Sequence, residues 1–299
     1  MVKKILRLLK SFFYGIRTSR IVCQLINLTH KKRFTLNPPN LNSSEQDILE
    51  KINNDGVSQC SIEEFFDLKS VQLIESRGKK IREFLAHSIN SNNSTDFGGK
   101  DFLVRYYDMK KNLEIEDQLI FEVVQGSFFD IARTYFGQDV KISNIDYWLN
   151  FDNQKEENPI SSQKWHRDYE DERVLKIFLY FEDVTLNHGP FSYVKKTHKS
   201  GKHKDIYPVS PPLGISLSDQ QVSNYFCEKE IKEFQVPKGT ILFADTAGIH
   251  KGGLCFKETR FLFTATYTSF AGISPRNYEI YNIDLKSFRG HSKRALGYF

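Results

Sequence analysis

Four segments rich in β-branched and aromatic residues constrain the fold of this chain more than any other feature. They span residues 141–151, 173–181, 241–244 and 260–267, and the stretches between them contain Gly, Pro and Asn. Apolar and polar residues alternate in many of these segments, as in strands with one face toward a core. The 299 residues are 39% hydrophobic and 14% aromatic, which is sufficient for one large core. We therefore predict a mainly β fold with a double-stranded β-helix core of the jelly-roll or cupin-like type.

Helical spacing of apolar residues is found mainly in the first half of the chain. Residues 45–53, 76–89 and 116–136 show it, and Ser43-Ser44 precede the first of these segments as candidate caps. We expect these helices to buttress one sheet. The predicted organisation is a basic amphipathic N-terminal segment, residues 1–44, followed by a single domain, residues 45–299.

The pair His166 and Asp168 is the first candidate for chemistry. Residues two apart in a strand lie on the same face, so both side chains can reach one metal ion. His250 follows the apolar segment 241–244 and a turn, so a returning strand could deliver it as the third ligand. Two imidazoles and one carboxylate form the facial triad of non-haem Fe(II) oxygenases, which leaves positions for a co-substrate and dioxygen. We predict that His166, Asp168 and His250 bind Fe(II) and are catalytic.

Arg260 is the candidate for binding the co-substrate. It lies ten residues after His250 and opens the segment 260–267. Its guanidinium can hold a carboxylate bidentately, which lysine cannot do. A 2-oxo acid that chelates the metal would offer its distal carboxylate to this arginine, and that describes 2-oxoglutarate. Asn150 is a second candidate contact with 2-oxoglutarate, and the alternative is that Asn150 only caps its strand.

At these positions the chain resembles the phytanoyl-CoA dioxygenase-like family of Fe(II)/2-oxoglutarate-dependent oxygenases, over residues 49–267. The likeness lies in Leu49 to Val57, Trp165-His166-Arg167-Asp168, the stretch from Gly189-Pro190-Phe191 to His198, His250 and Arg260. The resemblance implies hydroxylation, or another oxidation of a C–H bond, with Fe(II), 2-oxoglutarate and O2 and release of succinate and CO2. Asp168 fits this chemistry, because relatives that halogenate carry a small residue in place of the carboxylate.

The sequence departs from the family pattern at two places. Lys195-Lys196-Thr197-His198 stands where the family usually has Pro-Gly-Ser-His, so the loop is expected to differ in shape. Gly252 stands where relatives often carry a hydroxyl side chain that contacts 2-oxoglutarate, so Arg260 is expected to carry more of the binding. His198 is expected to be structural. Lys176 could point inwards beside the site, but a solvated position is commoner for lysine.

The N-terminal segment is strongly basic. Nine Lys and Arg residues precede Glu45, the first acidic residue, and the rest of the chain has 33 basic and 37 acidic residues. Because the positive excess lies at one end, we expect no nucleic-acid partner. Ile5, Leu8, Phe12 and Ile16 belong to an apolar stripe at helical spacing, so residues 1–34 are a candidate for peripheral contact with an anionic membrane. Packing of this helix on the domain and a transit peptide are the alternatives.

The substrate cannot be chosen from the sequence. The resemblance covers enzymes for very different molecules, so we expect a small-molecule, lipid-linked or sugar-linked substrate. Four scattered cysteines favour a reducing compartment, and we expect a cytoplasmic protein that is peripheral at the membrane if its N-terminal segment binds there. Two other functions stay open: a non-catalytic β-helix binding or assembly module, and a cupin-type metalloenzyme that does not use 2-oxoglutarate.

Overall fold

Two antiparallel sheets that face each other form the centre of the molecule. The structure is a computed structural model that describes residues 15–16, 19–90, 102–110, 117–152, 159–209, 214–273 and 288–298. The larger sheet has the order β1 (Val57–Ser61), β9 (Thr240–Asp245), β5 (Leu175–Tyr180), β11 (Arg260–Thr268), β3 (Lys141–Asn150) and β2 (Leu103–Arg105). The smaller sheet has the order β7 (Ser216–Leu217), β4 (Trp165–His166), β10 (His250–Gly252), β6 (Phe191–Val194) and β8 (Ile231–Glu233). This arrangement confirms the predicted double-stranded β-helix, and all four segments predicted to be strands are strands.

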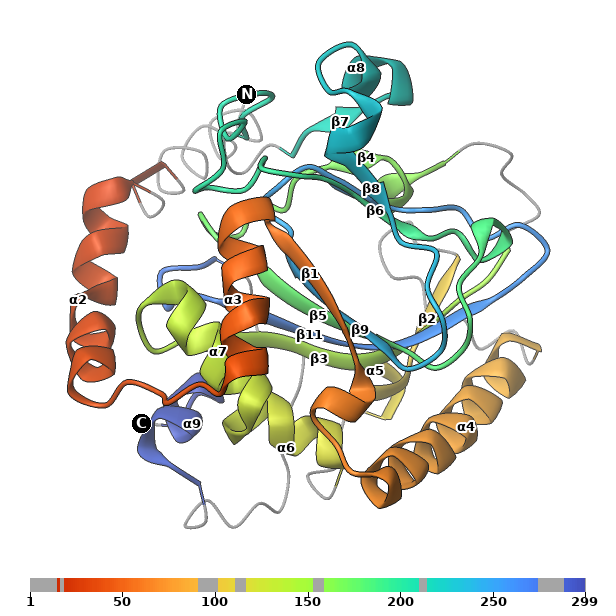
Figure 1. Ribbon diagram of the computed structural model, residues 1–299, viewed down its shortest axis with the longest axis horizontal. Helices are drawn as coiled ribbons and strands as arrows, with labels where there is room; N and C mark the ends of the chain where they lie inside the picture. Colours follow the sequence, from red (N-terminus) through yellow and green to blue (C-terminus); the bar gives the residue numbers. More distant parts are fainter. Residues whose placement is uncertain are drawn as a thin grey trace, which may run out of the picture.

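Helices cover the outer face of the larger sheet (Figure 1). They are α3 (Ser43–Asp55), α4 (Leu68–Asn90), α6 (Gln118–Gln125), α7 (Ser127–Phe136) and α9 (Gly290–Ala295), while α5 (Tyr106–Lys110) follows β2 and α8 (Asp219–Ser223) follows β7. Helix α3 begins after Asn42, which caps it through a reciprocal pair of hydrogen bonds with Glu45, so the predicted caps Ser43 and Ser44 lie inside the helix. The predicted helix 116–136 is two helices, because the chain leaves helical geometry at Gly126.

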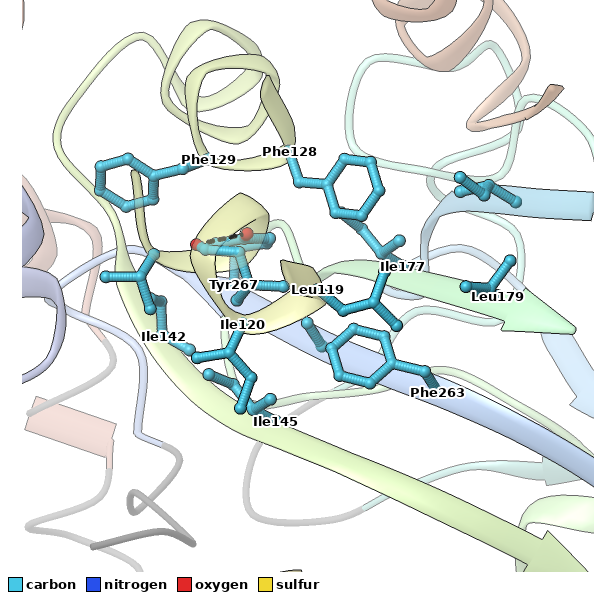
Figure 2. Close-up of a cluster of buried hydrophobic side chains, with 14 of the residues drawn as sticks. Leu119, Ile120, Phe128, Phe129, Ile142, Ile145, Ile177, Leu179, Phe263 and Tyr267 are labelled. Atoms are coloured by element: carbon cyan, nitrogen blue, oxygen red, sulfur yellow. Dashed lines mark hydrogen bonds between the residues drawn. The ribbon is translucent and has the colours of Figure 1, made fainter. Parts of the chain in front are cut away.

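The largest core lies between these helices and the larger sheet (Figure 2). Alternate residues of β5 and β11 point into it, as the period of two in strands requires, whereas an irregularity in the pairing of β3 with β11 puts both Ile142 and Ile145 of β3 on the core face. The residues labelled come from α6 and α7 on one side and from β3, β5 and β11 on the other: Leu119, Ile120, Phe128, Phe129, Ile142, Ile145, Ile177, Leu179, Phe263 and Tyr267. Tyr267 also donates its hydroxyl to the Val123 carbonyl of α6 at 2.8 Å, which joins the sheet to this helix.

The opposite face of the larger sheet points toward the smaller sheet. Phe178, Tyr180 and Leu262 pack there against Phe191 and Tyr193 of β6. Because residues at even positions of β5 and β11 face the smaller sheet, Lys176 and Arg260 are also directed into the space between the two sheets. This space contains the candidate site.

Helix α2 (Arg20–Leu36) packs against one side of the domain (Figure 1). Asn27 accepts a hydrogen bond from the Ala271 amide at 3.1 Å, and the ring of His30 stacks on Phe270 with centroids 3.6 Å apart. Packing on the domain, which was the alternative raised for the N-terminal segment, is thus found for residues 20–36. Of the apolar stripe predicted from Ile5 to Ile16, the described residues include Ile16, which is exposed. None of the described helices is long and apolar enough to cross a membrane.

Candidate metal centre

His166, Asp168 and His250 form one cluster between the two sheets. Strands β4 and β10 pair with His166 directly opposite His250, and the two imidazole centroids are 4.2 Å apart. Asp168 follows β4, where its amide donates to the Thr246 carbonyl at 2.8 Å. Ligand atoms of all three side chains lie within 4.8 Å of one another, close enough to bind one ion. The fold thus brings His250 next to His166 and Asp168, although His250 lies more than 80 positions further along the chain.

The hydrogen bonds of both imidazoles prepare them to bind a metal. Nδ1 of His166 is 2.8 Å from the Lys164 carbonyl, and Nδ1 of His250 is 3.0 Å from the Gly248 carbonyl. Because a carbonyl can only accept, each Nδ1 must carry the proton, which leaves the lone pair on Nε2. Burial, with His166 nearby, holds the pKa of His250 well below its usual range, so the imidazole is neutral as a metal ligand requires.

Lys176 of β5 contributes a cation that the sequence analysis had placed in solvent. Its ammonium nitrogen lies 2.6 Å from Oδ2 of Asp168, and the two side chains are only 19% and 11% exposed. Burial alone would raise the pKa of Asp168, but Lys176, His250 and His166 outweigh it and bring the pKa well below its usual range. Asp168 is therefore held as a carboxylate, the form that binds metals. The strand period puts Lys176 on the same face as Phe178 and Tyr180, but that this face points into the cavity follows from strand pairing, which the sequence does not determine.

Arg260 and Asn150 lie in the same cavity as the three clustered side chains. This cavity has a volume of about 100 Å³. Arg260 donates one hydrogen bond to the His188 carbonyl at 3.1 Å, but its Nε is buried and has no hydrogen-bond partner among the described residues. Asn150 is paired with Arg260 across β3 and β11, and its amide nitrogen is 3.4 Å from the Arg260 carbonyl. A buried guanidinium with an unused donor favours an anionic ligand.

Trp148 of β3 also lines this cavity. Its ring lies under the guanidinium of Arg105 at 5.0 Å, and its indole Nε1 is buried without a hydrogen-bond partner among the described residues. Tyr180, which sequence reasoning did not single out, lines the cavity as well. Both residues face inward because of strand register, which the sequence alone does not determine.

Two buried side chains hold the segments that carry the cluster. Asp245, at the end of β9, accepts from the Tyr135 hydroxyl at 2.5 Å and from the amides of Val174 and Ala247 at 3.0 and 3.1 Å. These bonds fix the turn that leads to His250. Arg167 donates to the carbonyls of Thr197, Ala247, Ile206, Tyr207 and Lys204. The loop after β6 is thereby joined to the strand that carries His166.

His198 is not part of the cluster. It is fully buried, and its Nε2 lies 3.0 Å from the Asn53 carbonyl, which agrees with the predicted structural role. The divergent loop before it holds β10 in place, because Thr197 accepts from the Ile249 amide at 2.8 Å. Lys195 and Lys196 of this loop pair with Asp55, the last residue of α3.

The donor set fits a ferrous ion. Two neutral imidazoles and one ionised carboxylate converge from β4, the following residues and β10, which is the pattern of a facial triad. The cavity beside the cluster contains a buried cation, Arg260, at a place where a small diacid bound to the metal could end. The residues therefore match both Fe(II) and 2-oxoglutarate in chemistry and in burial.

The family model of phytanoyl-CoA dioxygenase (PhyH) matches residues 55–254, and the chain belongs to this family. It is accordingly an oxygenase that depends on iron and 2-oxoglutarate. No match was found among curated proteins.

Solved structures with similar folds share little sequence with this chain. EctD from S. alaskensis with bound Fe is 14% identical, with 83% of this chain and 85% of that chain covered and a TM-score of 0.49. HygX from Streptomyces hygroscopicus with nickel, 2-oxoglutarate and hygromycin B is 16% identical, with coverage of 77% and 88% and a TM-score of 0.48. AviO1 from Streptomyces viridochromogenes Tue57 is 13% identical, with coverage of 78% and 98% and a TM-score of 0.49.

Lys176→Met is expected to destabilise the metal-free protein and to increase the stabilisation that added Fe(II) provides. Without the ammonium, the buried Asp168 carboxylate loses its nearest counter-charge, at a cost of roughly 3 kcal/mol. A metal ion restores the compensation, so the mutant gains more from iron than the wild type does. Anaerobic thermal unfolding with and without Fe(II) measures both effects. Lys238→Met, which removes an exposed ion pair with Glu75, is the control. It should change neither the stability of the metal-free protein nor the stabilisation by Fe(II) by more than about 1 kcal/mol.

Proposed function

We propose that His166, Asp168 and His250 bind Fe(II), and that Arg260 and Asn150 bind 2-oxoglutarate. On this assignment the protein is a hydroxylase that inserts oxygen into an aliphatic C–H bond of a small, lipid-linked or sugar-linked substrate. The observation that carries the proposal is the common cavity: the three ligand side chains and the buried guanidinium of Arg260 line the same space.

Each of these side chains has a defined task. Nε2 of His166 and of His250 would hold the metal, since each Nδ1 is engaged with a carbonyl. Asp168 would supply the third ligand atom, with its other oxygen retained by Lys176. Arg260 would hold the distal carboxylate of 2-oxoglutarate in a charge-assisted pair, and Asn150 would contact it by its amide. Iron with 2-oxoglutarate and O2 supplies the oxidation, in which one oxygen atom enters succinate, the other enters the product, and CO2 is released.

The two other functions considered from the sequence are less consistent with this site. A cupin-type metalloenzyme without 2-oxoglutarate would have no use for the unsatisfied Arg260 donor. A non-catalytic module would have no need for an intact set of ligands with both histidine tautomers fixed. Co-substrate consumption separates these alternatives from the proposal.

The proposal is tested by succinate formation under 18O2. The purified protein with Fe(II) and 2-oxoglutarate should form succinate slowly without substrate, since uncoupled turnover still consumes 2-oxoglutarate, and one succinate oxygen should carry 18O. The same reaction with His166→Ala should give none. Succinate without the isotope, or equal formation by the variant, would contradict the assignment.

Gly252→Ser is expected to tighten 2-oxoglutarate binding. A Cβ at position 252 would lie 3.5 Å from the Arg260 Nη2, an ordinary contact, so the serine fits and its hydroxyl can reach the same carboxylate. One added hydrogen bond to a charged group contributes about 1.5 kcal/mol, or roughly tenfold in Kd. Anaerobic titration of the Fe(II) protein with 2-oxoglutarate measures the change, and Gly252→Ala, which adds the methyl group alone, is the matched control. Equal affinity in the two variants would show that the hydroxyl makes no contact with the ligand.

We also propose that residues 45–299 form the catalytic domain and that the basic segment before it contacts an anionic, cytoplasmic membrane surface. Ile21, Leu25, Leu28 and Leu36 of α2 are 62–75% exposed, and their spacing puts them on one face of the helix. The opposite face carries Asn27 and His30, which bind the domain. An exposed apolar stripe within a basic segment suits a bilayer interface with anionic lipids.

Leu25→Glu with Leu28→Glu should abolish binding to vesicles that contain phosphatidylserine. The two charges would face the headgroups and replace apolar area that enters the interface. Co-sedimentation with vesicles measures binding, and Leu73→Glu, an exposed leucine on α4, is the control for a general effect of charge. Equal sedimentation of the double variant and the wild type would show that this face of α2 does not bind the membrane.

A further inference from the structure

The cavity that holds the metal cluster is too small for a second organic molecule. Its volume of about 100 Å³ is well below the roughly 300–1,000 Å³ of sites that enclose a drug-sized ligand. Iron and 2-oxoglutarate would occupy it. A substrate of that size therefore needs further space next to the same cluster.

A second cavity fulfils this requirement. Its volume is about 330 Å³, and it shares Asp168 with the metal cavity. The segment after β4 forms one wall, and the loop after β6, through Thr197, Lys204 and Val209, forms another. Because Asp168 lines both cavities, a substrate in the second cavity would lie beside a residue of the metal cluster.

Helix α2 closes this second cavity, although it precedes the segment that matches the family model. Cys23 of α2 lines it together with Ala271. The helix is held there because Asn27 accepts from the Ala271 amide and the Asp139 amide donates to the His30 carbonyl at 3.3 Å. A neighbouring polar cavity of about 350 Å³ also includes Cys23, so α2 borders both spaces. This wall is therefore a property of this chain rather than of the matched segment.

Most charged groups around the second cavity are already engaged. Arg167 donates its hydrogen bonds to backbone carbonyls. Lys199 forms an ion pair with Glu172, and Asp171 accepts hydrogen bonds from the backbone amides of Ser269 and Glu172. Glu170 interacts electrostatically with Lys176, but its Oε2 is buried without a hydrogen-bond partner among the described residues. A buried carboxylate oxygen is costly unless a donor reaches it.

We propose that this cavity binds the primary substrate, and that Glu170 accepts a hydrogen bond from a hydroxyl or ammonium group of that substrate. The inference rests on the proposed function, since it takes Asp168 as the metal ligand where the two cavities meet. Glu170 lies two residues after Asp168, so a group bound to it is fixed relative to the metal. Substrates that present only acceptors near this carboxylate are disfavoured by repulsion.

The experiment uses the full chain with Fe(II) and 2-oxoglutarate under anaerobic conditions, and saturation-transfer NMR with three probes: 1-hexanol, hexylamine and hexanoate. We expect one or both donor probes to bind and hexanoate not to bind. Glu170→Leu should weaken the bound donor at least fivefold. Cys23→Trp and Val209→Trp, which fill the cavity from opposite walls, should each remove binding, whereas Cys227→Trp, at an exposed cysteine, should not.

Binding of hexanoate equal to that of the donors, binding unaffected by both tryptophan variants, or no binding of any probe would overturn the proposal. Equal affinity in Glu170→Leu would overturn the role of the carboxylate, and preference for hexanol or hexylamine identifies which donor the site takes. The charge-transfer absorption of the Fe(II)–2-oxoglutarate complex should persist in both tryptophan variants. Its absence from the wild type would instead count against the proposed function.

Discussion

Replacing His250 with alanine is expected to abolish iron binding and turnover while the protein remains folded. In the proposed site His250 is one of three ligand side chains among the described residues, and a site with one imidazole and one carboxylate keeps too few donors to retain Fe(II). The fold should survive because the two sheets are held by their large apolar cores, to which this ring adds little. Iron content after anaerobic loading, succinate formation and the far-ultraviolet circular dichroism spectrum test the three parts of this expectation.

His87→Ala is the matched control for His250→Ala. His87 is an exposed histidine on α4, away from the cavity, so its removal should change neither iron content nor succinate formation. A folded His250→Ala protein that binds one Fe(II) with wild-type affinity would contradict the ligand assignment. A variant that fails to fold is replaced by His250→Gln, which keeps most of the side-chain volume and is expected to lose iron in the same way.

Arg260→Ala should raise the concentration of 2-oxoglutarate that is needed for half-saturation by a large factor. Arg260 is only 7% exposed, so removing its guanidinium leaves the buried carboxylate of the ligand without its pair. Such a loss costs about 2–5 kcal/mol, which corresponds to a weakening from roughly 30-fold to several thousand-fold. Equilibrium titration of the Fe(II) protein with 2-oxoglutarate measures the change directly, without a substrate.

Arg260→Lys separates the charge from the geometry of the guanidinium. Lysine keeps the positive charge but offers no planar fork, so the affinity for 2-oxoglutarate should lie between those of the wild type and Arg260→Ala. Iron affinity without 2-oxoglutarate should stay within about threefold of the wild-type value in both variants. Unchanged affinity for 2-oxoglutarate in Arg260→Ala would exclude this residue from the binding site.

The strands and the clustered residues could be predicted because their signals are local. The segments 141–151 and 260–267 have a composition that few other structures accept, and His166 and Asp168 share a face by the period of a strand alone. His250 could be added because a turn follows a buried strand. The family resemblance then supplied the expected spacing to Arg260, and the structure places all of these side chains around one cavity.

Features that depend on register or on distant packing could not be predicted. Lys176 looks like any lysine on a strand until the pairing of β5 with β11 and β9 directs it between the two sheets, beside Asp168. The wall formed by α2 depends on contacts between Asn27 and Ala271, which are 244 residues apart. The break at Gly126 was missed because helical spacing of apolar residues continues through it.

Anaerobic titration of the purified protein with Fe(II) and 2-oxoglutarate tests the central claim most directly. A 2-oxo acid that chelates ferrous iron gives a weak visible charge-transfer band, and this measurement requires no knowledge of the substrate. The wild type should develop the band with one equivalent of each ligand. His250→Ala should not develop it, and Arg260→Ala should do so only at much higher 2-oxoglutarate. A folded, iron-loaded wild type without the band would contradict the assignment of 2-oxoglutarate to this cavity.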